Sequence, residues 1–229
     1  ANSCVSTKTV AITQPAAALA AAITQTNILC FGLNTGAASV ATTGGTTAYT
    51  YVWAPTGGTS ATASALIAGN YTCTITDANA CTLVKTFALT QGSAFTISGS
   101  ATNTVLCNGV STILNGAGAS TYTWTGGVTN GTSFVPTTTT SYSLTGKNAS
   151  NCPASNTVVV TVTVNPNPTV VVNSGSICSG KSFTMTPTGA STYVYTGGSA
   201  IVSPSTNSSY TVTGTSALGC TNTAVATVT

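Results

Sequence analysis

The sequence predicts an all-β protein: three tandem Ig-like antiparallel β-sandwiches in a rod, with an extra N-terminal strand. Three observations support this fold class. Val, Ala, Ile, Tyr and Leu alternate with Thr, Ser and Asn in short runs, which is the pattern of half-buried strands. Turn residues recur about every 8–12 positions, as in small sandwiches. The chain also repeats itself, which indicates tandem units rather than one large domain.

Residues 1–14 are predicted to form a strand that lacks a sheet. Their sequence ANSCVSTKTVAITQ returns as ANACTLVKTFALTQ at residues 78–91, where it closes the first sandwich. An unpaired strand keeps its N–H and C=O groups without partners until another sheet edge is supplied. Either the chain was cut from a longer array, or the strand is donated to a neighbouring molecule. We favour donation, with a donor strand that includes Lys8, Val10 and Ile12.

The first sandwich is assigned to residues 15–91. It contains an aromatic strand at residues 49–53, a Pro-Thr-Gly-Gly turn and a further strand before Asp77. The Ala-rich start, residues 16–22, has helix propensity. We predict a strand there, because Leu19, Ala21 and Ile23 alternate with smaller residues.

The second and third sandwiches are assigned to residues 92–165 and 166–229. They repeat each other: STYTWTGG at residues 120–127 corresponds to STYVYTGG at residues 191–198. Two prolines in the connection Asn-Pro-Asn-Pro, residues 165–168, predict a short and stiff link.

Eight cysteines without C-x-x-C spacing, in a chain without histidine, favour disulfides over a zinc site and indicate an oxidising, extracellular compartment. Their repeated positions predict one disulfide in each sandwich, and each bond would contribute on the order of 4 kcal/mol. Two cysteines are then left over, and we predict that they bond across two chains. The predicted pairs are Cys30–Cys81, Cys107–Cys152 and Cys178–Cys220, with Cys4–Cys73 between chains.

Charged residues make up only 2% of the chain. They are Lys8, Lys85, Lys147, Lys181 and Asp77. Four scattered lysines do not form the clustered positive surface that nucleic-acid binding needs. No apolar run is long enough to span a membrane. Residues 1–10 lack the features of a signal peptide, which favours a processed chain.

The same inventory predicts that the protein is not an enzyme and holds no metal or other cofactor. General acid–base chemistry needs a group that titrates near the working pH, but His and Glu are absent and Asp77 is the one carboxylate side chain. Lys181 and Ser182 are adjacent on an expected strand, so they would face opposite sides and form no dyad. Asp77 and Asn79 are predicted to form an Asx turn rather than a metal site.

The aromatic strands have two interpretations. Their side chains either pack into the sandwich cores or form a platform that binds sugars, and we favour the cores. The residues concerned are Tyr51, Trp53, Tyr122, Trp124, Tyr193 and Tyr195. Glycans attached to the chain itself would explain how a nearly uncharged β-protein avoids aggregation. Sequons for such glycosylation begin at Asn70, Asn130, Asn148 and Asn207.

Several motifs of the first sandwich resemble the SprB-type repeat of Bacteroidetes surface adhesins. They are Cys30-Phe31-Gly32, TYVWAPTGG at residues 50–58, Gly69-Asn70-Tyr71-Thr72 and TDANAC at residues 76–81. The other two sandwiches resemble the Ig-like or PKD-like modules that accompany such repeats. Cys73 departs from the pattern, since the repeat usually has an apolar residue there. The resemblance implies a bacterial cell-surface or extracellular fibrous protein.

Together these observations predict a structural subunit of an extracellular bacterial surface fibre, with adhesion or matrix roles. Its partners would be copies of itself, joined head to tail when residues 1–14 add to a sheet of the next molecule. The alternative is a carbohydrate-binding fragment of a long cell-surface adhesin.

Overall fold

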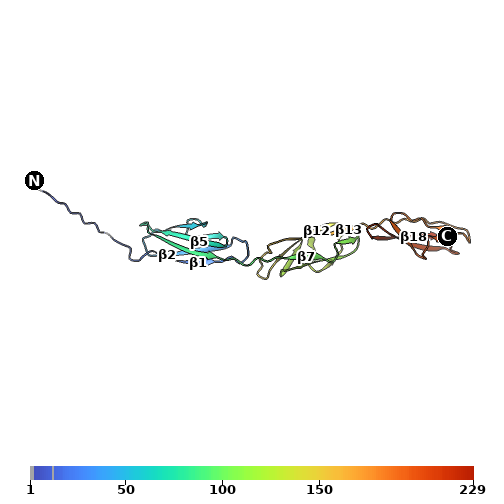
Figure 1. Ribbon diagram of the computed structural model, residues 1–229, viewed down its shortest axis with the longest axis horizontal. Helices are drawn as coiled ribbons and strands as arrows, with labels where there is room; N and C mark the ends of the chain where they lie inside the picture. The colour runs from blue at the N-terminus through green and yellow to red at the C-terminus, as the bar shows by residue number, and fades with distance from the viewer. Residues whose placement is uncertain (1–2, 12) are drawn as a thin grey trace. The chain divides into compact units, whose positions relative to one another are not determined.

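The computed structural model describes residues 3–11 and 13–229 and confirms the all-β fold class. Within these described residues, one short 3-10 helix, η1 (Thr125–Gly127), is present beside the strands. The chain divides into two compact units, Ala1–Phe95 and Thr96–Thr229. Figure 1 shows their strands in colours that follow the sequence. The boundaries of three separate sandwiches stay a prediction.

The first unit consists of two antiparallel sheets, with strand orders β1-β2-β4 and β3-β5-β6. A parallel bridge between Ile28 and Gln91 places the segment after β1 beside the chain that follows β6. The strands are β1 (Ala20–Thr26), β2 (Gly36–Thr43), β3 (Thr50–Ala54), β4 (Thr62–Leu66), β5 (Gly69–Thr76) and β6 (Thr82–Leu89).

The core of the first unit lies between these two sheets. Alternation along β5 buries Tyr71, Cys73 and Ile75 on one face. The ring of Phe87 on β6 stacks on the ring of Tyr71 with 5.6 Å between the ring centroids. It meets Trp53 edge-on with 5.8 Å between the ring centroids. The predicted Ala-rich strand begins only at Ala20, and the side chains of Leu19, Ala21 and Ile23 pack against the core.

The second unit begins with two further sheets, ordered β10-β12-β13-β8 and β11-β9-β7. β8 pairs with β13 in parallel, and the other pairs are antiparallel. The strands are β7 (Ser98–Ala101), β8 (Val105–Cys107), β9 (Thr112–Ala117), β10 (Thr121–Trp124), β11 (Ser133–Phe134), β12 (Thr140–Lys147) and β13 (Val158–Asn165).

The rest of the second unit has the sheets β15-β17-β18 and β14-β16, and a parallel bridge from Gly175 to Val228. The strands are β14 (Phe183–Thr184), β15 (Thr192–Tyr195), β16 (Ile201–Val202), β17 (Ser208–Thr215) and β18 (Thr221–Val228). The same arrangement therefore occurs three times: a long last strand pairs antiparallel with the strand before it and is met in parallel by an early segment. We call β1–β6, β7–β13 and β14–β18 the first, second and third repeats.

Burial predicts which side chains stabilise the first unit. Replacing Ile75, which is fully buried, by Ala should lower the free energy of unfolding by about 2–5 kcal/mol, because a cavity opens in the core. Val84→Ala, on the exposed face of the neighbouring β6, should change it by less than about 0.5 kcal/mol. Urea unfolding of both variants measures the difference, and equal losses would contradict this description of the core.

Candidate functional site

The N-terminal segment is exposed and unpaired along its described part. Residues 3–11, 13 and 14 belong to no strand, and the side chains of Val5 and Val10 are 82% and 73% exposed. Figure 1 draws this segment as irregular chain before β1. Of the predicted donor residues, Ile12 lies outside the described residues. Lys8 and Val10 align with Lys85 and Phe87, which are partly buried along β6. The segment thus carries the inward-facing pattern of a last strand without a sheet to cover it.

Each repeat has a five-residue turn that ends in a cysteine just before or near its last strand. We call residues 77–81, 148–152 and 216–220 the cysteine turns. In each, the side-chain oxygen of the first residue accepts a hydrogen bond from the cysteine N–H, and the fourth residue has a positive φ. These first residues are Asp77 at 2.8 Å, Asn148 at 3.0 Å and Ser216 at 3.2 Å; the fourth residues are Ala80, Asn151 and Gly219.

A second set of cysteines lies at the other end of each last strand. We call Cys30, Cys107 and Cys178 the strand-end cysteines. Each is followed by one residue and then a glycine with φ between +74° and +88°, so the chain turns immediately after the cysteine. Backbone hydrogen bonds to the end of the last strand hold this segment: Ile28 N to Thr90 O, Asn108 N to Asn165 O, and Ile177 N to Thr229 O, all 2.9 Å.

The structure joins a strand-end cysteine to a cysteine turn of the next repeat. Cys107 of the second repeat is bonded to Cys220 of the third, with 5.5 Å between their Cα atoms. Cys30 and Cys152 each take part in a disulfide. Cys81 and Cys178 are free thiols on exposed residues, as is Cys4. The predicted pairs Cys30–Cys81, Cys107–Cys152 and Cys178–Cys220 are therefore wrong.

Strand length explains this correction. Cys220 directly precedes the eight-residue β18, whereas Cys178 lies near its far end, where Gly175 bridges to Val228. Eight residues at about 3.3 Å each span roughly 26 Å. A disulfide needs Cα atoms about 4.4–6.8 Å apart. Cysteines at opposite ends of one repeat cannot meet, but a strand-end cysteine and the cysteine turn of the following repeat can.

The predicted interchain pair Cys4–Cys73 also disagrees with the structure. Cys73 is 0% exposed, in the core of the first unit, and burial raises the pKa of its thiol. A bond to Cys4 of another chain would require the core to open. Cys73 instead behaves as a small apolar core residue. This agrees with the apolar residue that the SprB-type repeat usually has at this position.

Asp77 is held by the backbone of its own turn and of the preceding loop. Its Oδ2 accepts from Thr46 N at 3.0 Å, and its Oδ1 accepts from Asn79 N and Cys81 N. The hydrogen bond from Thr46 N, with smaller contributions from the turn, lowers the pKa of this carboxyl. The predicted Asx turn is confirmed. No group of three His, Cys, Asp or Glu side chains able to share a metal ion occurs among the residues described.

The two tryptophans of the aromatic strands are core residues. Trp53 is 5% and Trp124 3% exposed, and their Nε1–H groups donate to Ser60 O and to Asn130 Oδ1. The tyrosines are partly buried, and three of their hydroxyls bond locally: Tyr51 to Thr42, Tyr122 to Ala119, and Tyr193 to Ala190. Tyr195 is also half-buried. These residues therefore do not present a shared aromatic platform for sugars.

The predicted glycosylation sites differ in their surroundings. Asn130 and Asn148 are half-buried, and their side-chain oxygens accept hydrogen bonds, from Gly116 N and Trp124 and from Ser150 N and Cys152 N respectively. Asn70 and Asn207 are exposed. Glycosylation stays a prediction at all four, with fewer packing constraints at Asn70 and Asn207.

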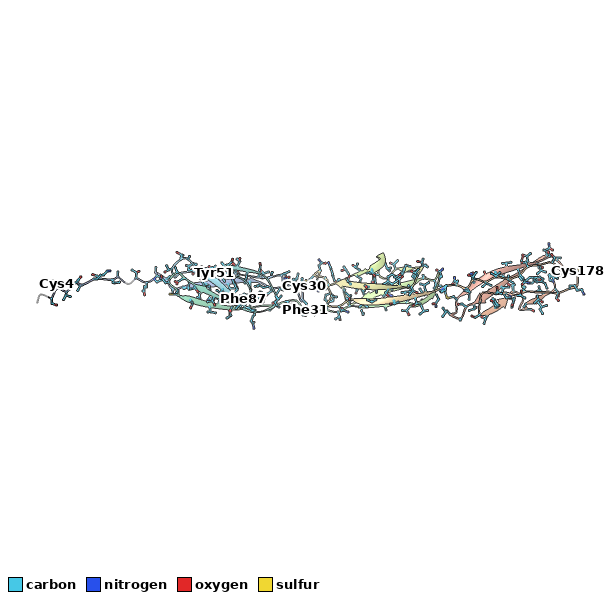
Figure 2. The ribbon with its side chains drawn as sticks, turned by 90° about the horizontal axis from the view of Figure 1, so that it is seen from above. Cys4, Cys30, Phe31, Tyr51, Phe87 and Cys178 are labelled. Carbon is cyan, nitrogen blue, oxygen red and sulfur yellow. A yellow bond between two sulfur atoms is a disulfide. The ribbon has the colours of Figure 1, made fainter. Side chains whose placement is uncertain are left out.

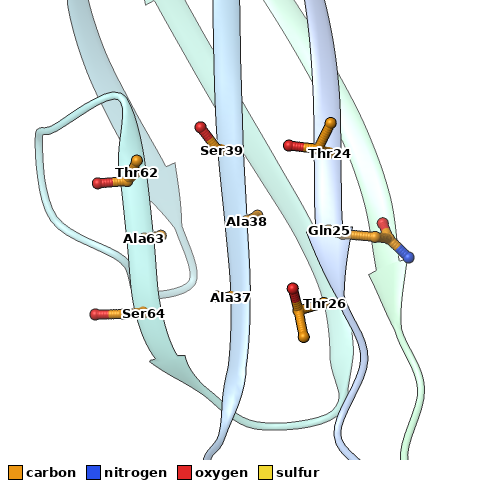
Figure 3. Close-up of a pocket in the computed structure, with 9 residues that line it drawn as sticks. All are labelled: Thr24, Gln25, Thr26, Ala37, Ala38, Ser39, Thr62, Ala63 and Ser64. Carbon is orange, nitrogen blue, oxygen red and sulfur yellow. The ribbon is translucent and has the colours of Figure 1, made fainter.

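A shallow depression of about 240 Å³ lies on the sheet β1-β2-β4 (Figure 3). It is lined by hydroxyl, methyl and amide groups, without a charged or aromatic side chain. The lining residues are Thr24, Gln25, Thr26, Ala37, Ala38, Ser39, Thr62, Ala63 and Ser64. This surface offers weak polar contacts only. Among the residues described, no helix is long and apolar enough to cross a membrane.

Residues 22–58, within the first unit, match the family model of the SprB repeat. This match, as the resemblance of the motifs implied, indicates a cell-surface module of the adhesin type. No match was found among curated proteins.

Similar solved structures include the N-terminal eight Ig domains of Down syndrome cell adhesion molecule, at 14% identity and a TM-score of 0.40, over 93% of this chain and 35% of that one. A structure of a 1.5-MDa bacterial ice-binding adhesin is similar at 13% identity and a TM-score of 0.33, over 92% of this chain and 97% of that one. The chain thus spans about a third of the first of these. Similarities at this level do not define a function.

The lowered pKa of Asp77 predicts acid sensitivity in the first unit. The carboxylate contributes stability above its unfolded pKa of about 3.9, and this contribution is lost as the pH falls through the lower folded pKa. Asp77→Asn should weaken this acid dependence and keep the turn, because Asn148 serves the same role in the second repeat. Asp77→Ala should also destabilise the unit at neutral pH.

Urea unfolding between pH 7 and pH 2 tests this, in a Trp124→Phe background so that Trp53 fluorescence reports on the first unit. An unchanged acid dependence in Asp77→Asn would contradict the role assigned to the carboxylate.

Proposed function

We propose that this protein is a structural subunit of an extracellular bacterial surface fibre, in which copies join head to tail and residues 1–14 add as a strand to a sheet of the neighbouring copy. The observation that carries the proposal is the N-terminal segment: it has the sequence of a sheet-closing strand, and its described part is exposed and unpaired. The role is structural and non-catalytic, in keeping with a chain that lacks His and Glu. The adhesin-type module at residues 22–58 supports the surface location.

The strand needs an open edge on its acceptor. In all three repeats the position of the last strand is filled by the chain's own β6, β13 or β18. Residues 1–14 therefore add outside the existing sheets rather than into a vacant position. Among the described strands, β3, β10 and β15 lie at sheet edges on the side opposite the last strand. A strand added there pairs main-chain N–H and C=O groups on both chains.

Side-chain direction adds a hydrophobic contribution. Val10 aligns with Phe87, which is half-buried and packs on Trp53 and Tyr71. Its neighbour Thr9 aligns with Thr86, which is exposed. Successive residues of a strand face opposite sides, so Val10 faces the acceptor core when Thr9 faces solvent.

Deleting residues 1–14 should abolish assembly without lowering the stability of the folded units, because the described part of this segment takes part in no sheet. Electron microscopy and light scattering measure assembly, with the free thiols alkylated beforehand so that only non-covalent association is scored. Regular filaments from the truncated chain would rule out strand addition by this segment.

Two point substitutions, each of which adds one carboxylate, refine the test. Val10→Asp should weaken assembly at least tenfold, because a carboxylate would be buried against the acceptor sheet. Thr9→Asp, on the outward face, should assemble within about twofold of the original chain. Equal effects of the two substitutions would show that the segment does not bind as a strand in this register.

A further inference from the structure

The exposed thiols at Cys81 and Cys178 are complementary. The bonded pair Cys107–Cys220 joins the strand-end cysteine of one repeat to the cysteine turn of the next. Cys178 is the strand-end cysteine of the third repeat, and Cys81 belongs to the cysteine turn of the first. The last repeat thus has a free cysteine of one kind and the first repeat a free cysteine of the other kind.

We propose that Cys178 of one copy forms a disulfide with Cys81 of the next copy, which links the chains end to end through the same junction that joins the second and third repeats. The partner is a second copy of this chain. The inference uses the head-to-tail order of the proposed function but does not depend on strand addition by residues 1–14.

The surroundings of Cys178 match those of bonded Cys107. Lys181 N donates to Cys178 O at 3.0 Å, as Val110 N donates to Cys107 O at 3.1 Å, and Gly180 and Gly109 both have positive φ. Cys178 lies at the end of the second unit, where Figure 2 labels it. The same backbone turn therefore presents both sulfur atoms, and of the two only Cys107 is bonded.

The surroundings of Cys81 match those of bonded Cys220. In both turns the cysteine N–H donates to the side chain of the first turn residue. In both, the backbone N–H of that first residue also donates to the cysteine carbonyl, at 3.0 Å for Asp77 and 2.8 Å for Ser216. They differ in what covers them. Cys220 is 0% exposed and its sulfur lies 3.9 Å from Asn165 O of the second repeat. Cys81 is exposed.

Cys81 also opens onto a space that an incoming chain can enter. It lines a recess of about 560 Å³ together with Asp77, Thr82, Gly45 and residues 14–19. In the third repeat the corresponding stretch is the connection at residues 165–168, and Asn222 donates to Pro168 O there. The recess beside Cys81 is thus in the position where the bonded junction places the preceding repeat.

Opposite charges accompany the two thiols. Lys181 follows Cys178 by three residues, and Asp77 begins the turn of Cys81. The bonded junction has Val110 and Ser216 at these positions. Asp77 is 5% exposed and its oxygens accept backbone hydrogen bonds, so Lys181 would be attracted to it across the junction without pairing with it directly.

The reaction is a thiol–disulfide exchange with a low-molecular-weight disulfide such as oxidised glutathione. The Cys178 thiolate attacks this disulfide, forms a mixed disulfide and releases one glutathione thiolate. The Cys81 thiolate of the second copy then attacks the protein sulfur and releases the other glutathione. Two protein thiols are oxidised, and one oxidant disulfide is reduced to two thiols.

The test uses full chains carrying Cys4→Ser, to remove the third exposed thiol, in a glutathione redox buffer. This chain should give a ladder of covalent oligomers on non-reducing gels, and peptide mapping should find residues 178 and 81 cross-linked. Adding Cys178→Ser or Cys81→Ser should each leave monomer. Mixing these two variants should restore one product of twice the 22.4 kDa chain mass, because each supplies one compatible end.

Several results would overturn the inference: no ladder while the Cys107–Cys220 bond forms, links that map to like cysteines, or a mixture that stays monomeric. Mass spectrometry of the internal bond serves as the folding control for every variant. A chain lacking residues 1–14 separates the two proposals. If it still forms the 178–81 link, the disulfide holds and strand addition does not drive it. If the original chain assembles without this link, the fibre proposal stands and the disulfide does not.

Discussion

The hydrogen bond that closes each cysteine turn is the local constraint on which the arrangement of the cysteines depends. In all three repeats a short polar side chain accepts from the cysteine N–H, over 2.8–3.2 Å. Asp, Asn and Ser are the side chains whose oxygen reaches the backbone within a tight turn. The bond fixes where the chain reverses before the last strand, and in the third repeat it places Cys220 within reach of Cys107.

Because the surface carries little charge, few charged side chains protect the open strand edges from pairing with other chains. Soluble β-proteins often protect an edge with a lysine, and this chain has four lysines in all. The exposed faces carry Thr, Ser and isolated valines such as Val52 and Val84. With so few charged side chains, electrostatic repulsion between copies of the molecule is weak.

Much of the fold could be predicted from the sequence, because strand alternation and turn residues act over a few positions. The alternating burial of β5 and the Asx turn at Asp77 are examples. Repetition also identified the equivalent cysteines correctly, yet the pairing drawn from it was wrong. Equivalence says which positions repeat, whereas bonding depends on which positions meet in space. Predicting the bonded pairs required the length of the last strand and the order of the repeats along the chain. The burial of Cys73 could likewise be predicted, because it alternates along the strand with Tyr71 and Ile75.

The disulfide between Cys107 and Cys220 also sets the path of mechanical load. When a surface protein is pulled from its two ends, tension that reaches Cys107 crosses the S–S bond to Cys220 instead of following the backbone between them. The bond spans 113 positions of sequence. At about 3.4 Å per residue, unfolding of that segment would otherwise release roughly 380 Å of chain. While the bond is intact, the segment between these two cysteines stays locked and can be extended only after reduction, whereas residues 96–106 and 221–229 of the second unit lie outside this loop.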